Sequence, residues 1–116
     1  MRLFDSELKI MDILWTQGTM TAKELAEALA AGVGWNKNTT YTVLKKLVEK
    51  GAVKREDPGF HCEPLIAKED VRRDAVAELV DKLYDGSMQL LFASLLSGEK
   101  LTEKDRKELR DLIDKM

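Results

Sequence analysis

The chain has 116 residues and a formal net charge of −2, with 44% hydrophobic and 34% charged residues. This composition excludes a disordered chain and fits one folded domain or two small ones. Cys62 is the only cysteine, which excludes an intramolecular disulfide and fits a reducing compartment. The sequence shows neither a signal-peptide pattern nor an apolar run of roughly 20 residues, so we expect a cytoplasmic protein without direct membrane insertion.

The first two helices are predicted from their capping residues. Asp5 or Ser6 can cap the first helix, whose apolar residues recur at helical spacing until Gly18. The second helix begins with the capping box of Thr21 and Glu24, a Ser/Thr-x-x-Glu pattern that satisfies two free backbone amides reciprocally. The two glycines of the stretch "AAGVG" are expected to end this helix.

A third helix and a β-hairpin follow. Asn36 can cap a helix that runs to Lys50, and Gly51 supplies the left-handed residue that ends it. Two short extended runs, Ala52–Arg55 and Phe60–Leu65, flank the turn sequence "DPG". Helix, turn, helix and a two-stranded wing form the layout of a winged-helix DNA-binding domain.

The residues after the hairpin are predicted to be helical again. An apolar stripe runs along residues 67–84, Ser87 can cap the apolar segment "MQLLFASLL", and Thr102 can cap a last amphipathic helix. The predicted fold class is therefore mainly α. A winged helix-turn-helix, made of three helices and a β-hairpin wing, occupies residues 1–66, and a three-helix dimerisation region occupies residues 67–116.

The third helix is predicted to have two different faces. Its core side gathers Thr40, Val43, Leu44 and Leu47. Its opposite side is long and polar, and the segment 36–55 holds six basic residues against one acidic residue. The candidate DNA-contacting residues on this side and on the wing are Lys37, Asn38, Thr39, Tyr41, Thr42, Lys45, Lys46, Lys54 and Arg55.

These residue types suit the major groove of DNA. Asparagine can pair bidentately with adenine, and threonine can offer a hydroxyl to a base edge or a methyl group to thymine. Lysines neutralise phosphates, and the free amides at the start of the helix can receive a phosphate. A merely solvated helix face is the alternative interpretation. Basic residues continue from the helix onto the wing, at Lys54 and Arg55, and this continuity favours DNA binding.

At these residues the chain resembles the penicillinase repressor family of winged-helix regulators, the BlaI/MecI group. The resemblance covers nearly the whole chain and is carried by "LFDSELKIMDILWTQGTMTAKELAEAL", "WNKNTTYTVLKKLVEKGAVKRE", "PLIAKEDVRR" and "LTEKDRKELRDLIDKM". It implies a homodimer held by the C-terminal helices and a palindromic operator. It implies that the residues facing the groove are Asn38, Thr39, Tyr41, Thr42 and Lys46.

The resemblance also implies how repression ends. In the family, a membrane-bound sensor protease system leads to cleavage of the repressor in its dimerisation region. The chain lacks the Asn-Phe pair of that cleavage site and the C-terminal cysteine cluster of the copper-responsive branch, so copper sensing is not expected.

Dimerisation is also expected from the apolar stripes themselves. Leaving several leucine side chains in water costs about 1.5–3 kcal/mol each, and a partner chain related by a two-fold axis is the commonest way to bury them. The alternative is that the region completes a monomeric core. The candidate dimerisation residues are Val71, Ala75, Leu79, Leu83, Leu91, Phe92, Leu95, Leu109, Leu112 and Ile113.

No enzyme, metal site or cofactor is predicted. His61 is the only histidine, and its neighbour Cys62 should point to the opposite face of the predicted strand, so one metal ion would rarely use both. Two other functions stay open. The chain could be a winged-helix module whose basic face binds an acidic protein, or a repressor gated by a small molecule bound in the dimerisation region.

Overall fold

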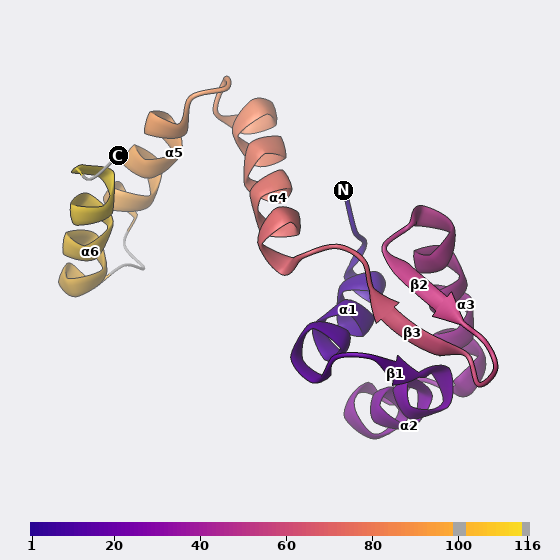
Figure 1. The fold of residues 1–116 in the computed structure, drawn as a ribbon. Coiled ribbons are helices and arrows are strands. Elements are labelled where there is room, and N and C mark those ends of the chain that lie inside the picture. The colour runs from indigo at the N-terminus through magenta and orange to yellow at the C-terminus, as the bar shows by residue number, and fades with distance from the viewer. Residues whose placement is uncertain (99–101, 115–116) are drawn as a thin grey trace. The chain divides into compact units, whose positions relative to one another are not determined.

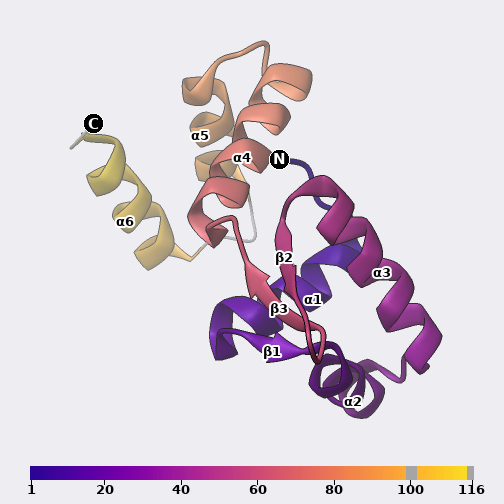
Figure 2. The same ribbon diagram turned by 45° about the vertical axis from the view of Figure 1, so that its right-hand side comes forward.

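The computed structural model describes residues 1–98 and 102–114, and for residues 109 and 112–114 it describes the backbone alone. The chain divides into two compact units, Met1–Asp74 and Ala75–Met116, and each is described by itself. Figures 1 and 2 show the elements of both units. Within the described ranges, no helix is long and apolar enough to cross a bilayer.

The first unit is a winged helix-turn-helix, as predicted. Its elements are α1 (Asp5–Gln17), β1 (Met20–Thr21), α2 (Ala22–Val33), α3 (Lys37–Lys50), β2 (Val53–Glu56), β3 (His61–Pro64) and the start of α4 (Lys68–Leu83) (Figure 1). The predicted hairpin is antiparallel, with Arg55 paired to Cys62. Strand β1, which was not predicted from the sequence, pairs with the other side of β3 and completes the sheet order β1-β3-β2. Two residues are too few to show a strand pattern.

The predicted start of α1 was wrong. Phe4 rather than Asp5 or Ser6 occupies the N-cap position. The side chain of Phe4 makes no capping hydrogen bond; instead, the Phe4 amide donates to Glu7 Oε1 at 2.8 Å. A carboxylate that reaches back to the cap amide forms half of a capping box, so this half alone defines the start of α1.

The ends of α2 and α3 follow their capping chemistry. Glu24 N donates to Thr21 Oγ1 at 3.1 Å and Thr21 N donates to Glu24 Oε1 at 3.4 Å, which confirms the predicted capping box. The helix continues through the first predicted glycine and ends only at Gly34, which is left-handed with φ of 74°. In α3, Thr39 N donates to Asn36 Oδ1 at 2.8 Å. Gly51 closes α3 in the left-handed conformation, as predicted.

The core of the first unit lies between its three helices and the hairpin. All four residues predicted for the core side of α3 are buried. Cys62 is fully buried and its neighbour His61 is exposed, which confirms the alternation expected of a strand. The fully buried apolar residues are Ile10, Met11, Leu14, Leu25, Leu44, Leu47, Ala52 and Cys62, with relative exposure of 0%.

The link into α4 is fastened to the first unit. Trp15 Nε1 donates to the carbonyl oxygen of Ile66 at 2.9 Å, and Ile66 packs against the core. Lys68 Nζ lies 3.4 Å from Asp12 Oδ1 and above the Trp15 ring. The first turns of α4 therefore belong to the winged-helix unit.

The second unit contains the rest of α4, together with α5 (Met88–Ser97) and α6 (Glu103–Asp114). Ser87 and Thr102 cap α5 and α6 as predicted: Leu90 N donates to Ser87 Oγ and Asp105 N donates to Thr102 Oγ1.

The candidate dimerisation residues differ in exposure. Ala75, Leu79, Leu83 and Leu95 are exposed, Val71 and Phe92 are half-buried, and Leu91 is already buried within its own chain. The side chains of Leu109, Leu112 and Ile113 lie outside the described part of the structure.

Candidate nucleic-acid interface

Helix α3 is held rigidly by its core side and presents its opposite side to solvent. Leu44 and Leu47 are fully buried, whereas Lys37, Asn38, Thr42, Lys45 and Lys46 are exposed. The remaining candidates on this helix, Thr39 and Tyr41, are half-buried. The helical periodicity therefore separated the two faces correctly, and a helix so anchored can place its exposed side chains in fixed positions.

The two threonine hydroxyls of the exposed side are already used as donors. Thr42 Oγ1 donates to the Asn38 carbonyl at 2.8 Å, and Thr39 Oγ1 donates to Asn36 Oδ1 at 3.0 Å. Each hydroxyl therefore offers a ligand its acceptor lone pairs, and the threonine also offers its methyl group. The sequence could not decide between donor and acceptor roles, because the choice depends on the cap and the helix geometry.

Lys37, Lys45 and Lys46 of α3 are available to bind anions, whereas Lys50 is paired with Glu7. Within the described residues, Lys45 and Lys46 have no hydrogen-bond or ion-pair partner. Lys37 Nζ lies 5.6 Å from the centroid of the Tyr41 ring, a cation–π distance. Lys37 also shares a hollow of about 260 Å³ with Lys23 of α2, a cation that the sequence analysis did not select.

The cations of the wing are paired with carboxylates. Lys54 Nζ lies 2.8 Å from Glu56 Oε1, and Arg55 Nε donates to Asp57 Oδ2 at 3.1 Å. The hydrogen bond with Glu56 raises the pKa of Lys54 and the same bond lowers the pKa of Glu56. The basic segment 36–55 stops directly before these two acids. Residues two apart on a strand share a face, so strand periodicity alone could have found the Lys54–Glu56 pair.

Helix α3 and the wing meet through aromatic contacts. The rings of Tyr41 and Phe60 pack edge to face with centroids 5.9 Å apart, and the Arg55 guanidinium carbon lies 3.7 Å from the Phe60 centroid. Phe60 has a φ of 50°, which is rare for a bulky residue, and its carbonyl accepts from Ala22 N at 2.9 Å. These contacts fix the wing against the exposed side of α3.

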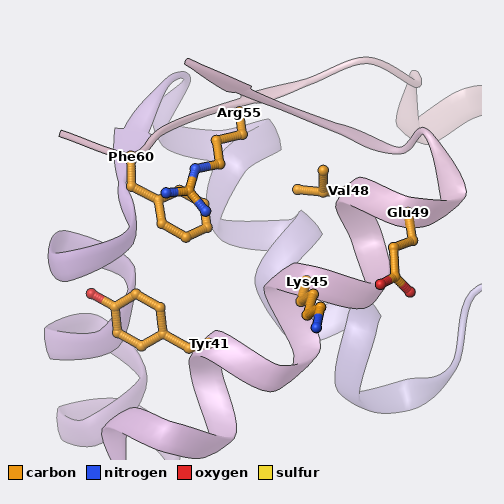
Figure 3. Close-up of a pocket in the computed structure, with 6 residues that line it drawn as sticks. All are labelled: Tyr41, Lys45, Val48, Glu49, Arg55 and Phe60. Atoms are coloured by element: carbon orange, nitrogen blue, oxygen red, sulfur yellow. The ribbon is translucent and has the colours of Figure 1, made fainter. Parts of the chain in front are cut away.

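A hollow of about 430 Å³ lies between α3 and the wing (Figure 3). Its lining combines predicted residues with side chains that the sequence analysis did not select as contacts. The six lining residues are Tyr41, Lys45, Val48, Glu49, Arg55 and Phe60. Only the packing of the hairpin on the helix brings them together.

A buried carboxylate ties the end of α3 to α1. Glu7 is 1% exposed, and its Oε1 accepts from Lys50 Nζ at 2.6 Å. Lys50 Nζ also lies 4.5 Å from the centroid of the Phe4 ring. Because separating a buried ion pair strands a charge, the pair holds the C-terminal end of α3 in place.

Comparisons with known proteins agree with this geometry. A family model described as penicillinase repressor matches residues 3–115. The methicillin resistance regulatory protein MecI of Staphylococcus aureus (strain N315) is 23% identical over 112 residues, covering 95% of this chain and 91% of the relative. The penicillinase repressor of Bacillus licheniformis is 23% identical over 115 residues, covering 97% and 90%.

A solved structure extends the similarity to the fold. The solution structure of the DNA-binding domain of the repressor BlaI superposes with a TM-score of 0.56 and 28% sequence identity. The match covers 60% of this chain and 87% of that domain.

Proposed function

The chain belongs to the penicillinase repressor family, and we propose that it acts as a homodimer that represses transcription from a palindromic operator. Membership confirms the resemblance noted from the sequence, and it places the chain among DNA-binding transcriptional repressors rather than enzymes. The proposed refinements are the residues that contact DNA, the dimer and the operator symmetry.

The division of α3 into a buried and a polar face carries the proposal. Four side chains of α3 are buried, while its amide, hydroxyl and lysine groups face outward. In helix-turn-helix proteins such a helix enters the major groove, where Asn38 and Thr42 would meet base edges. Lys45 and Lys46, which have no partner among the described residues, would meet phosphates.

The wing makes a smaller electrostatic contribution in this proposal. Lys54 and Arg55 each lie beside a carboxylate of their own strand or turn. A phosphate near them would compete with Glu56 or Asp57, so the net gain per contact is reduced. We therefore assign the main phosphate contacts to α3.

Dimerisation is proposed from the exposed apolar side chains of the second unit. Leu83 is 72% exposed, Leu90 is 50% exposed and Leu95 is 41% exposed. Contiguous exposed apolar surface is the usual mark of an interface. A two-fold axis would present two α3 helices to successive major grooves about 34–36 Å apart, which would make the operator a palindrome.

Relief by cleavage is the last part of the proposal. A membrane-bound sensor protease system acting on the dimerisation region would separate the two winged-helix units of the dimer. One dimer could then no longer bind both half-sites of the operator. A reporter under an operator should then be derepressed together with loss of the full-length chain. Derepression with an intact chain would contradict this part.

Selection of binding sites from a random duplex pool tests DNA recognition directly. We expect a palindrome bound about 10³-fold or more above scrambled DNA. Replacing Lys46 with Ala should reduce the salt slope by about 1.8, because the dimer loses two phosphate contacts, whereas Asn38→Ala or Thr42→Ala should change base preference. Lys9→Ala, on α1, removes the same charge as a control.

Binding that is blind to sequence and lost with modest salt would contradict the proposal. It would leave the basic face as a docking surface for an acidic protein.

A further inference from the structure

The hollow between α3 and the wing has the size of a small-molecule site. Its volume of about 430 Å³ lies within the range of roughly 300–1,000 Å³ found for ligand pockets. Two elements separated by a turn build it, so its shape depends on how the wing packs on α3 (Figure 3).

One end of the hollow is an aromatic corner. The Tyr41 and Phe60 rings meet edge to face, and Val48, two turns further along α3, adds aliphatic surface to the lining. Phe60 keeps the unfavourable left-handed conformation, and the Ala22 amide holds its carbonyl at 2.9 Å. Strain of this kind persists where the surrounding structure requires it, and it concentrates at binding sites. The corner therefore offers a preformed surface for a flat apolar group.

The charged groups of the hollow are arranged unevenly. The Arg55 guanidinium covers the Phe60 ring, and Lys45 has no partner within the part of the chain that the structure describes. Glu49 lies at the end away from Phe60 (Figure 3). An anionic group placed between Lys45 and Arg55 would gain charge-assisted hydrogen bonds. It would share Arg55 with Asp57, whose carboxylate accepts from Arg55 Nε at 3.1 Å, and it would lie near Glu49, one helical turn from Lys45.

We propose that this hollow binds a small aromatic carboxylate, with its ring against Tyr41 and Phe60 and its carboxylate between Lys45 and Arg55. Bound there, the ligand covers three residues that are also candidate DNA contacts, Tyr41, Lys45 and Arg55. It would therefore compete with DNA and lift repression. This competition rests on the proposed function, whereas binding of the carboxylate does not.

Titration of the full-length chain with 2-naphthoate, followed by NMR of the Tyr41 and Phe60 rings, tests the site. We expect shifts at both rings and a Kd of roughly 1 mM or tighter, as fits a ligand of this size. Lys45→Gln should weaken binding about tenfold, because one charge-assisted hydrogen bond is lost. Lys46→Gln, the neighbouring lysine that does not line the hollow, should change the Kd less than about twofold.

Three results would overturn the site. They are no shift at either ring up to about 10 mM naphthoate, equal binding of the neutral 2-naphthamide, or equal losses in the two lysine variants. Glu49→Gln tests whether the negative charge of Glu49 weakens binding of the carboxylate. Removing the acid should tighten binding of the carboxylate, and weaker binding would contradict the assigned orientation.

A separate titration with DNA tests the competition. Naphthoate should raise the apparent Kd for the selected operator in the wild type more than in Lys45→Gln. Ligand uptake by the intact DNA complex would show that the hollow is not covered by DNA and would overturn the competition. Failure of the chain to bind any operator would defeat the proposed function, while the ring shifts would still decide the site.

Discussion

The two units of the chain bury their apolar residues to very different extents. In the first unit, the helices and the hairpin enclose residues such as Ile10, Leu14 and Leu44, each with 0% exposure. In the described part of the second unit, the buried apolar side chains are Val80 and Leu91. The exposed large hydrophobics of that unit are Val76, Leu79, Leu83, Met88, Leu90 and Leu95.

This difference shows which part of the molecule is complete as a single chain. The first unit encloses most of its large apolar groups without help, because three helices and a sheet close around one centre. Its exposed large apolar residues are Met1, Phe4, Val33 and Leu65. Three short helices cannot enclose all of the apolar side chains that they carry. The second unit therefore needs another surface to pack against. We infer that α3 is positioned by the first unit alone, and that the second unit determines how many copies act together.

The largest expected effect comes from charging the exposed stripe of α4. Leu79→Asp combined with Leu83→Asp should prevent dimerisation and lower operator affinity about 10²–10⁴-fold, since linked half-site binding is lost. Light scattering and operator titration measure the two changes. Lys82→Asp, on an adjacent exposed position, is the control that adds an acid to the same helix.

The same variant should leave the first unit folded. Trp15 and Trp35, the two tryptophans of the chain, both lie in that unit, so their fluorescence reports its unfolding alone. A large loss of denaturant resistance by this signal would contradict the independence of the two units.

A core substitution in the first unit should lower the stability of that unit, which the charged variant of α4 should leave unchanged. Leu44→Ala removes a side chain with 0% exposure and should lower the free energy of unfolding by about 2–5 kcal/mol. Tryptophan fluorescence in urea measures the change. Leu65→Ala, at a side chain that is 52% exposed, should cost much less, and equal losses would show that the packing of α3 is misplaced.

Cys62 offers a chemical measure of how closed the first unit is. Burial raises the pKa of its thiol from 9.0 to about 11. Iodoacetamide near pH 8 should therefore alkylate the folded chain about 100-fold more slowly than the unfolded chain, because less thiolate is present. Because the folded state holds the thiol proton more tightly than the unfolded state, protonation of Cys62 stabilises the fold. This contribution is present below about pH 9 and is lost as the pH rises through about 11. Equal alkylation rates would mean that the wing opens readily.

The smallest expected effect is a stabilisation. Thr40 is 0% exposed, and its hydroxyl has no hydrogen-bond partner among the described residues. Thr40→Val keeps the branched shape and removes the unpaired polar atom, so the free energy of unfolding should rise by about 1 kcal/mol. Thr42→Val is the matched control, because that hydroxyl is exposed and already donates to Asn38. A destabilised Thr40→Val would indicate a hidden partner for the hydroxyl.

The sequence by itself determined the N-terminal caps of α2 and α3, the end of α3 and the two faces of α3. Caps such as Thr21 and Asn36 act on amides three residues away, and Gly51 ends α3 through its own backbone freedom. Helical spacing likewise separated the buried face of α3 from its polar face. These features depend on hydrogen bonds and side-chain directions within one or two turns, so a short window of sequence contains the information.

Only the tertiary structure decided what the polar face of α3 is joined to. Glu7 and Lys50 are 43 positions apart, and nothing near either residue predicts their buried pair. The hollow requires Phe60 to approach Tyr41, which depends on the packing of the hairpin. Contacts of this kind form because the whole chain minimises exposed apolar surface at once, and that balance cannot be computed from any single segment.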